Sequence, residues 1–270
     1  MGRALAVVSI GEVLWDIIGA EKHLGGAPFN FAVHCHHLGA RSGIVSRVGR
    51  DELGAEILTR ARELGVDTSL IQRDTERPTG QVRVTLSTGG QPAFDICTGV
   101  DYDYLAADPV AVERVSGADV VCFGTLAQRH PVARQSIVTL LEAASLRQPF
   151  GKLRAGSFDP SAPLRAGKAQ GKARGTARAL LVCDLNLRPP HYSVEVVRDS
   201  LARCHLLKLN DDELHVVREM LGRDDVDDDQ FLLHLLDAYG LELVCVTLGA
   251  RGCILRTCQE RVVAPGYPCQ

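Results

Sequence analysis

The feature that most restricts the fold is a repeated pattern of short apolar runs, most of them followed by a polar or glycine-rich turn and then by a helical segment. Runs of this kind cover residues 5–10, 44–48, 119–123, 179–183, 206–209 and 243–247. Strands that are apolar on both faces are typical of a parallel sheet covered by helices on both sides. Because strands that alternate with helices join in parallel, the sequence predicts an α/β fold. With 46% apolar residues among 270, the chain can bury a sizeable core.

Residues 77–94 follow a different pattern, in which apolar and polar side chains alternate. This period of two predicts antiparallel strands around the Gly89-Gly90 turn. We interpret these strands as a lid that lies outside the main sheet. The expected division is a β lid made of residues 16–24 and 77–100, and a core domain made of residues 1–15, 25–76 and 101–270.

Residues 147–178 fit neither pattern. The segment holds eight Lys or Arg residues and one acid, is rich in Gly, Ala and Pro, and repeats the sequence Leu-Arg-Ala-Gly. Because it has few large apolar side chains to bury, we expect a disordered, low-complexity basic insertion at the surface. It lies between a helix and the next strand, at the sheet edge away from the site predicted below. A basic loop that binds nucleic acid is the alternative.

Composition restricts the partners and the location. The net charge of −3 argues against general attraction to nucleic acids or membrane surfaces. The sequence has no apolar run of membrane-spanning length and no secretory signal, so we expect a cytoplasmic protein. The 9 cysteines form no CxxC pair, and several lie inside apolar runs, which predicts reduced, buried thiols.

The stretch from Leu24 to Ala32 is the first candidate binding element. Two glycines allow a tight turn and a close approach to a ligand, and Pro28 suits the first turn of a helix that ends near Gly39. Asn30 then lies in that first turn, near free backbone N–H groups that suit a polyhydroxylated or anionic ligand. A plain turn before a helix is the alternative.

Polar side chains also follow the first predicted strand. Glu12 and Asp16 come after the run of residues 5–10, at the end of a strand where open α/β sheets bind ligands. Together with Gly26 and Asn30, Asp16 has the hydrogen-bonding groups that sugar hydroxyls need. The alternative for Asp16 is a solvated acid in a loop.

Three later turns have two interpretations each. Asn210 and Glu213 have the spacing of a helix capping box, but the same pair could organise a hydrated Mg²⁺ near nucleotide phosphates. Arg188 could face a phosphate or substrate, or belong to an ordinary loop before two prolines. Residues 247–252 could form a bare turn between strands, or bring backbone N–H groups to a phosphate.

Two further clusters contain residue types that can bind metal ions, but neither has the spacing of a metal site. Of the histidines at positions 34, 36 and 37, only His34 and His37 share a helix face. The acids of residues 224–229 lack the spacing and the closing Glu of an EF-hand. We expect no metal site at either cluster.

Taken in order, the motifs resemble those of the PfkB (ribokinase-like) carbohydrate kinases, and within that family the fructokinases. The motifs are Gly11-Glu12, residues 25–28 with Asn30, Val48-Gly49 with Asp51 and Gly54, residues 123–129, residues 184–190, Asn210 with Glu213, and residues 247–249 with Gly252. No single motif is decisive, but seven in this order are specific. The resemblance covers the whole chain except residues 147–178.

The resemblance implies a three-layer α/β/α sandwich with a small β-sheet lid, and a reaction that transfers the γ-phosphate of ATP to a sugar hydroxyl with Mg²⁺. It also implies a homodimer formed through the lid. By the family pattern, the sugar would contact Asp16, Gly26, Asn30 and Gln128. The nucleotide would contact Asn186, Lys208, Thr247, Gly249 and Gly252. Asn210 and Glu213 would serve Mg²⁺, and Arg188 would assist the transfer between the two ligands.

One family motif is missing from the sequence. Members of the family carry Gly-Ala-Gly-Asp shortly after the stretch that here reads as residues 264–270, and that Asp is the catalytic base. We therefore expect a C-terminally truncated kinase, with the base beyond Gln270 and with impaired transfer. The alternatives are a non-catalytic relic that binds a sugar or a nucleotide, and a nucleoside kinase of the same superfamily.

Overall fold

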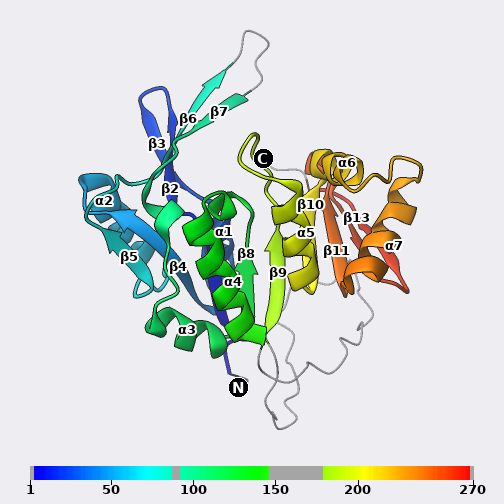
Figure 1. The fold of residues 1–270 in the computed structure, drawn as a ribbon, viewed down its shortest axis with the longest axis horizontal. Coiled ribbons are helices and arrows are strands. Elements are labelled where there is room, and N and C mark those ends of the chain that lie inside the picture. The colour runs from blue at the N-terminus through cyan, green and yellow to red at the C-terminus, as the bar shows by residue number, and fades with distance from the viewer. Residues whose placement is uncertain (1–2, 87–91, 146–178, 268–270) are drawn as a thin grey trace.

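A computed structural model describes residues 3–86, 92–145 and 179–267, and it contains two sheets (Figure 1). The nine strands of the larger sheet lie in the order β13-β12-β11-β10-β9-β8-β1-β4-β5. Their bounds are β1 Ala6–Ile10, β4 Arg41–Gly49, β5 Ile71–Asp74, β8 Val120–Phe123, β9 Leu180–Asp184, β10 Leu206–Asn210, β11 Leu243–Thr247, β12 Cys253–Arg256 and β13 Arg261–Ala264. In this sheet order, the seven strands from β11 to β5 are parallel to one another. Strand β12 pairs antiparallel with β11, and β13 pairs antiparallel with β12.

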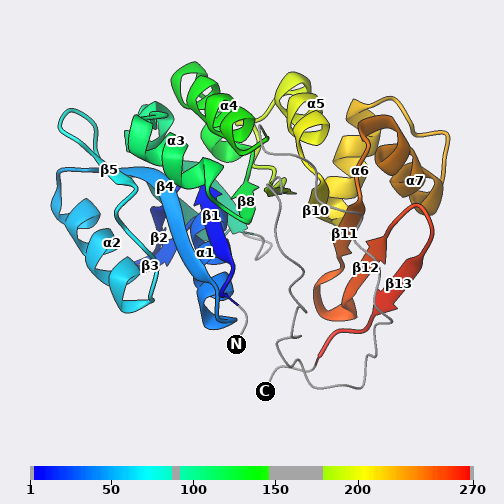
Figure 2. The ribbon, with the colours of Figure 1, turned by 90° about the horizontal axis from the view of Figure 1, so that it is seen from below.

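Helices cover both faces of this sheet. Their bounds are α1 Ala27–His37, α2 Glu52–Glu63, α3 Pro109–Ser116, α4 Pro131–Ser145, α5 Val194–Arg203, α6 Asp211–Met220 and α7 Asp228–Tyr239. Three short 3₁₀ turns are η1 Asp101–Tyr104, η2 Leu126–Gln128 and η3 Gly249–Arg251. Helices α3 to α7 lie on one face, and α1 and α2 lie on the other (Figure 2). The predicted three-layer α/β/α sandwich is therefore confirmed.

The core follows the apolar runs of the sequence. Ile10, Val121, Leu181, Leu207 and Val244, one from each of five neighbouring strands, are almost fully buried. They belong to a continuous apolar cluster under α3 to α7, and a second, smaller cluster lies beneath α1 and α2. Each large apolar side chain buried in this way contributes about 1.5–3 kcal/mol of hydrophobic free energy.

The second sheet has four strands in the order β3-β2-β6-β7. The bounds are β2 Leu14–Ile18, β3 Glu21–Gly25, β6 Gln81–Leu86 and β7 Pro92–Ile96. It projects from the edge of the core at which the parallel strands end (Figure 1), and we call it the lid. The predicted Gly89-Gly90 turn lies outside the described residues, as does the predicted insertion at 147–178.

Three elements have weak signals in the sequence. Strand β5 is short and half polar, and β13 is an edge strand whose side chains are half exposed, so neither forms a continuous apolar run. Helix α3 is short, so its apolar pattern is weak, although Asp108 and Pro109 are residues typical of a helix start. In the structure the Asp108 carboxylate caps this helix, because it accepts a hydrogen bond from the N–H of Ala111 at 2.8 Å.

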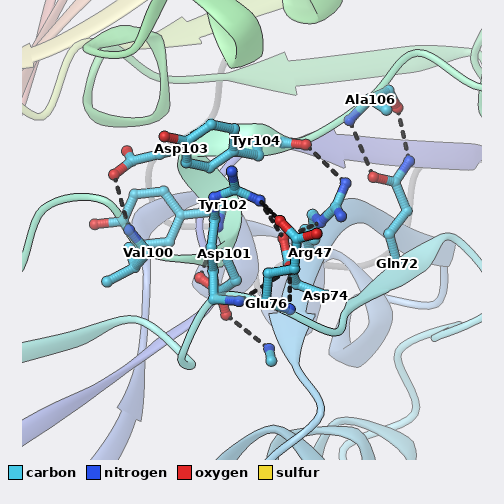
Figure 3. A network of polar contacts seen from close by, with 12 residues as sticks. Arg47, Gln72, Asp74, Glu76, Val100, Asp101, Tyr102, Asp103, Tyr104 and Ala106 are labelled. Carbon is cyan, nitrogen blue, oxygen red and sulfur yellow. Dashed lines mark hydrogen bonds and ion pairs between the residues drawn. The ribbon is translucent and has the colours of Figure 1, made fainter.

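A polar network joins η1 to the edge strand β5 and to its neighbour β4 (Figure 3). The Asp101 carboxylate accepts hydrogen bonds from the N–H groups of Gly49 and Gly80, at 3.1 and 3.2 Å. Arg47 forms an ion pair with Asp74 at 2.7 Å and donates a hydrogen bond to the Tyr104 carbonyl at 2.9 Å. These contacts satisfy polar groups that burial would otherwise penalise, and they fix the base of the lid against the core.

The Val48-Gly49 motif with Asp51 and Gly54 has a structural explanation. Asp51 caps the start of α2, because its carboxylate accepts hydrogen bonds from the N–H groups of Gly54 and Thr79, both at 2.8 Å. A Cβ at Gly54 would overlap the carbonyl oxygen of Gly49. The motif therefore joins α2 to the segment that leads into the lid.

Candidate functional site

The residues predicted to bind ligands gather where the parallel strands of the core end. Residues 11–16 follow β1, residues 184–188 follow β9, Asn210 ends β10, and Thr247 ends β11. The lid rises from the same edge (Figure 1). Ligands of open α/β sheets bind at this carboxyl edge, so the topology supports one shared site.

Asp16 lies on β2 of the lid and faces the turn before α1. A Cβ at Gly25 would overlap the Asp16 carboxylate, so the two residues are in close contact. Asp16 is half-buried, and this burial raises the pKa of its carboxyl, while Arg188 and His23 act in the opposite direction. The alternative of a solvated loop acid is therefore wrong.

The turn before α1 needs its glycine. Gly26 precedes the helix with φ at 109°, and a Cβ there would overlap the carbonyl oxygen of Glu12. Pro28 lies in the first turn of α1, as predicted, and Asn30 one turn into the helix is exposed. The Asn30 side chain is therefore accessible to a ligand, on the helix that follows the Gly25-Gly26 turn.

Glu12 is fully buried at the end of β1, with 1% of its surface exposed. Burial raises the pKa of its carboxyl to about 7, although the N–H groups of Glu12 itself and of Ala27 hydrogen bond to it. Asp184 and Arg188 are close enough to shift this pKa in opposite directions. The Gly11-Glu12 motif thus places a second carboxyl group beneath the site, and sequence reasoning did not include it among the site residues.

Arg188 connects the core to the lid. Its guanidinium carbon lies 5.3 Å from the ring centroid of Phe94 on β7, and the pKa of Asp16 on β2 also responds to its charge. Phe94 is exposed and was not predicted as a site residue, since a single aromatic residue in an alternating strand gives no signal in the sequence. Arg188 is therefore a core residue whose charge is felt on two lid strands, β2 and β7.

Hydrogen bonds to neighbouring elements fix the loop that carries Arg188. Asn186 has φ at 44°, a left-handed conformation that non-glycine residues other than Asn and Asp rarely adopt. The N–H of Leu187 donates a hydrogen bond to Glu213 at 2.8 Å, and Thr125 donates to the Leu185 carbonyl at 2.7 Å. These bonds fix the backbone on both sides of Asn186, in the loop that leads to Arg188.

Asp184 and Lys208 form an ion pair across neighbouring strands. Lys208 Nζ lies 2.9 Å from Asp184 Oδ1, and about a third of the Lys208 side chain is exposed. Because Asp184 ends β9 and Lys208 lies on β10, the pair links the Arg188 loop to the strand that leads to Asn210. The Lys208 ammonium is thus oriented along the carboxyl edge of the sheet.

Asn210 and Glu213 form the capping box that the sequence predicts. Asn210 Oδ1 accepts from the Glu213 N–H at 2.7 Å, and Glu213 accepts from the Asn210 N–H at 2.9 Å. The second oxygen of Glu213 accepts from Leu187, so both carboxylate oxygens have backbone partners. Within the described residues, no group of three His, Cys, Asp or Glu side chains could hold a metal ion. The capping box is therefore confirmed, and a role of the pair in organising a hydrated Mg²⁺ stays a prediction.

The turn between β11 and β12 is built on two glycines. Gly249 has φ at 58° with open space around it, whereas Gly252 has φ at 98° and a Cβ there would overlap the Ala264 carbonyl. Arg251 in the same turn forms an ion pair with Asp211 at the start of α6. Thr247 pairs with Asn210 in the β10–β11 register. Thr247, Gly249 and Gly252 thus lie together beside the capping box.

Gln128 does not join the other predicted sugar-binding residues. Its side chain is buried, and its amide nitrogen donates hydrogen bonds to the Gly124 carbonyl at 2.8 Å and to the Ser200 hydroxyl at 3.0 Å. Ser200 belongs to α5, on the face of the sheet opposite α1. The structure therefore gives Gln128 a packing role, which a motif position in the sequence cannot distinguish from ligand binding.

The comparisons with known proteins agree with this arrangement. The chain matches the family model of the pfkB family carbohydrate kinases over residues 7–270. It is 25% identical to the sugar kinase PH1459 of Pyrococcus horikoshii over 278 residues, which cover 97% of this chain and 75% of that protein. It is 27% identical to a fructokinase of Solanum tuberosum, with 93% of this chain and 72% of that protein covered.

Solved structures share the fold. A fructokinase from Xylella fastidiosa with bound ATP superposes with a TM-score of 0.75 at 21% identity, over 98% of this chain and 75% of that chain. The sugar kinase PH1459 in complex with ATP superposes with a TM-score of 0.74. None of the helices in the described ranges has the length and apolar character needed to cross a membrane. Because the family model matches nearly the whole chain, the protein belongs to the pfkB family of carbohydrate kinases.

Proposed function

We propose that the chain is a fructokinase-like sugar kinase, which transfers the γ-phosphate of ATP to a sugar hydroxyl. The observation that supports the proposal is one row of polar residues along the carboxyl edge of the sheet. The row runs from Asp16 on the lid through Arg188 and the Asp184–Lys208 ion pair to Thr247. A site of this length suits two ligands side by side.

The sugar would occupy the end of the row under the lid. Asp16 accepts hydrogen bonds, the Asn30 amide both donates and accepts, and the backbone at Gly26 allows close approach. This set suits a polyhydroxylated ligand with no charge of its own. The names of several relatives, which are fructokinases, support fructose as the first sugar to test.

The nucleotide would occupy the end of the row near the β11–β12 turn. Lys208 supplies a cation, and Thr247, Gly249 and Gly252 form a turn whose backbone a phosphate chain can approach. Asn186 lies between the two ends. Neighbouring structures in complex with ATP support ATP as the donor.

Phosphoryl transfer depends on positioning and on charge neutralisation more than on covalent chemistry. Arg188 would bind the transferred phosphate from the sugar side, because a guanidinium fork matches phosphate oxygens. Since Asn210 and Glu213 already satisfy each other, the proposal uses Mg²⁺ only as the ion that ATP brings with it. The 270 residues contain no Gly-Ala-Gly-Asp sequence, so we expect these residues alone to bind both ligands but to transfer phosphate slowly.

The remaining expectations concern assembly and location. A homodimer through the lid is supported by two exposed apolar side chains on lid strands, Ile18 and Phe94, each 46% exposed. Light scattering of the purified chain tests it, because a monomeric mass at micromolar concentration contradicts it. A cytoplasmic location and the absence of a nucleic-acid partner stay predictions.

Calorimetry and an ADP-release assay test the function together. We expect fructose to bind with a 1:1 stoichiometry and Asp16→Ala to weaken it by about 1.5–3 kcal/mol, the contribution of a hydrogen bond to a charged group. Binding of adenosine in preference to fructose and ribose would instead indicate a nucleoside kinase. Binding of fructose and ATP without turnover would indicate a non-catalytic relic, and no binding of any of these ligands would contradict the proposal.

A further inference from the structure

Glu12 is a buried acid that the proposed reaction does not use. Its side chain lies at the end of β1 with 1% of the residue exposed, and Oε2 has no hydrogen-bond partner within the described part of the chain. A buried carboxyl oxygen without a partner destabilises the folded state, and such groups are retained mostly where they serve a function.

Glu12 is attached to the start of α1. The N–H of Ala27, the first residue of the helix, hydrogen bonds to the carboxyl group. The Glu12 carbonyl fills the space that a side chain at Gly26 would need, and Pro28 packs against Gly11. The Gly26 contact involves the Glu12 backbone, so the Glu12 side chain acts on the α1 start, which carries Gly26 and Asn30, through the Ala27 N–H.

Glu12 also faces the loop that follows β9. Asp184 and Arg188 act on it from β9 and from that loop, with opposite signs. The other titratable groups around it come from three elements: Tyr102 from η1, Arg129 after η2, and Cys122 from β8. Arg129 is already paired with Asp103 at 2.7 Å, and Asp184 with Lys208, whereas Arg188 forms no ion pair with a carboxylate in the described part of the chain.

We infer that Glu12 is a positioning residue for sugar binding, which fixes the start of α1 relative to the loop that carries Arg188. The inference rests on the proposed function. The ionised carboxylate hydrogen bonds to the Ala27 N–H more strongly than the neutral acid does, and it attracts Arg188. The ionised form of Glu12 therefore holds Asn30 and Arg188 in positions where both contact the same sugar. Because this form binds the sugar better, sugar binding in turn favours ionisation of Glu12.

The first experiment needs no ligand. The backbone amide signals of the free chain are followed by NMR between pH 5.5 and 8.5, in the wild type, Glu12→Gln and the control Glu63→Gln. Glu63 is an exposed residue at the end of α2. We expect the amides of Ala27 and Arg188 to shift with one common midpoint near pH 7 in the wild type and the control, and not in Glu12→Gln.

Two results of this titration would overturn the inference. Shifts that persist in Glu12→Gln would assign them to another group, and a shift of Ala27 without Arg188 would show that the two elements are not coupled. The wild-type titration decides the matter even where Glu12→Gln does not fold, because the absence of a common midpoint contradicts the inference by itself.

The second experiment measures fructose affinity by calorimetry at pH 6 and pH 8. We expect binding about fivefold tighter at pH 8 in the wild type and in Glu63→Gln, and equal affinity at both pH values in Glu12→Gln. A purely structural role would weaken binding equally at both. Equal wild-type affinity at the two pH values overturns the inference. If the wild type binds no fructose at either pH, the proposed function fails, and the amide titration alone decides the role of Glu12.

Discussion

The guanidinium carbon of Arg188 lies 5.3 Å from the ring centroid of Phe94, and this contact joins the core to the lid. Arg188 follows β9, near the middle of the large sheet, whereas Phe94 lies on β7 at the edge of the lid (Figure 1). A cation above an aromatic ring is attracted by the ring electrons. The position of the lid is thus coupled to the residue that we propose to bind the transferred phosphate.

Replacing the aromatic ring should loosen the lid. We expect Phe94→Leu to weaken fructose binding by about 0.5–1 kcal/mol, the contribution of an exposed cation–π contact, with little change in melting temperature. Calorimetry of the variant and of Ile18→Ala measures this effect. Ile18 is exposed on the lid to the same extent, so an equal loss in both variants would assign the effect to the lid surface and not to Arg188.

Glu213 should contribute mainly to stability. Its two oxygens accept hydrogen bonds from Leu187 and Asn210, so Glu213→Ala removes two bonds to a charged acceptor, each worth about 1.5–3 kcal/mol. We expect a lower urea midpoint in Glu213→Ala and a smaller decrease in Glu213→Gln, which keeps one acceptor. A role as a direct metal ligand predicts the reverse: unchanged stability, and a greater Mg²⁺ requirement for ATP binding.

The two glycines of the β11–β12 turn offer a matched pair of variants. Gly249→Ala has open space and only the strain of a left-handed backbone, about 1–2 kcal/mol. Gly252 has φ at 98° and ψ at −135°, a conformation nearly restricted to glycine, and in Gly252→Ala the Cβ also overlaps the Ala264 carbonyl, so the turn must move. We expect Gly252→Ala to lose more stability and more ATP affinity, as measured by thermal unfolding and calorimetry. Equal ATP affinities in the two variants would place the nucleotide elsewhere.

The buried Glu12 makes stability depend on pH. Its folded-state pKa is about 7, above the ordinary value of 4.5, so the neutral acid is favoured in the folded state. The contribution to stability is fully present below pH 4.5 and is lost as the pH rises through 7, with a total of about 3 kcal/mol. Compared with Glu12→Gln, the wild type should therefore become less stable between pH 5 and pH 8 in urea unfolding. A constant difference across this range contradicts a raised pKa.

The sequence by itself determined the layers, most of the elements and the edge at which the site lies. Apolar runs on both faces of a strand force burial by helices, and this burial leaves few folds other than an α/β sandwich. This reasoning did not predict strands β5 and β13, because neither is a continuous apolar run. The start of α1 and the capping box at Asn210 depend on neighbours in the sequence, and local patterns were enough to predict both.

Only the tertiary structure decided which polar residues face each other. Gln128 and Glu12 have equally ordinary positions after a strand, yet the first bonds to Ser200 on α5 and the second lies buried against the start of α1. Phe94 reaches Arg188 across 94 positions of sequence. Contacts of this kind depend on how the large sheet, its helices and the lid pack together. Because the free energy that fixes them comes from burial of the whole core, no local pattern encodes them.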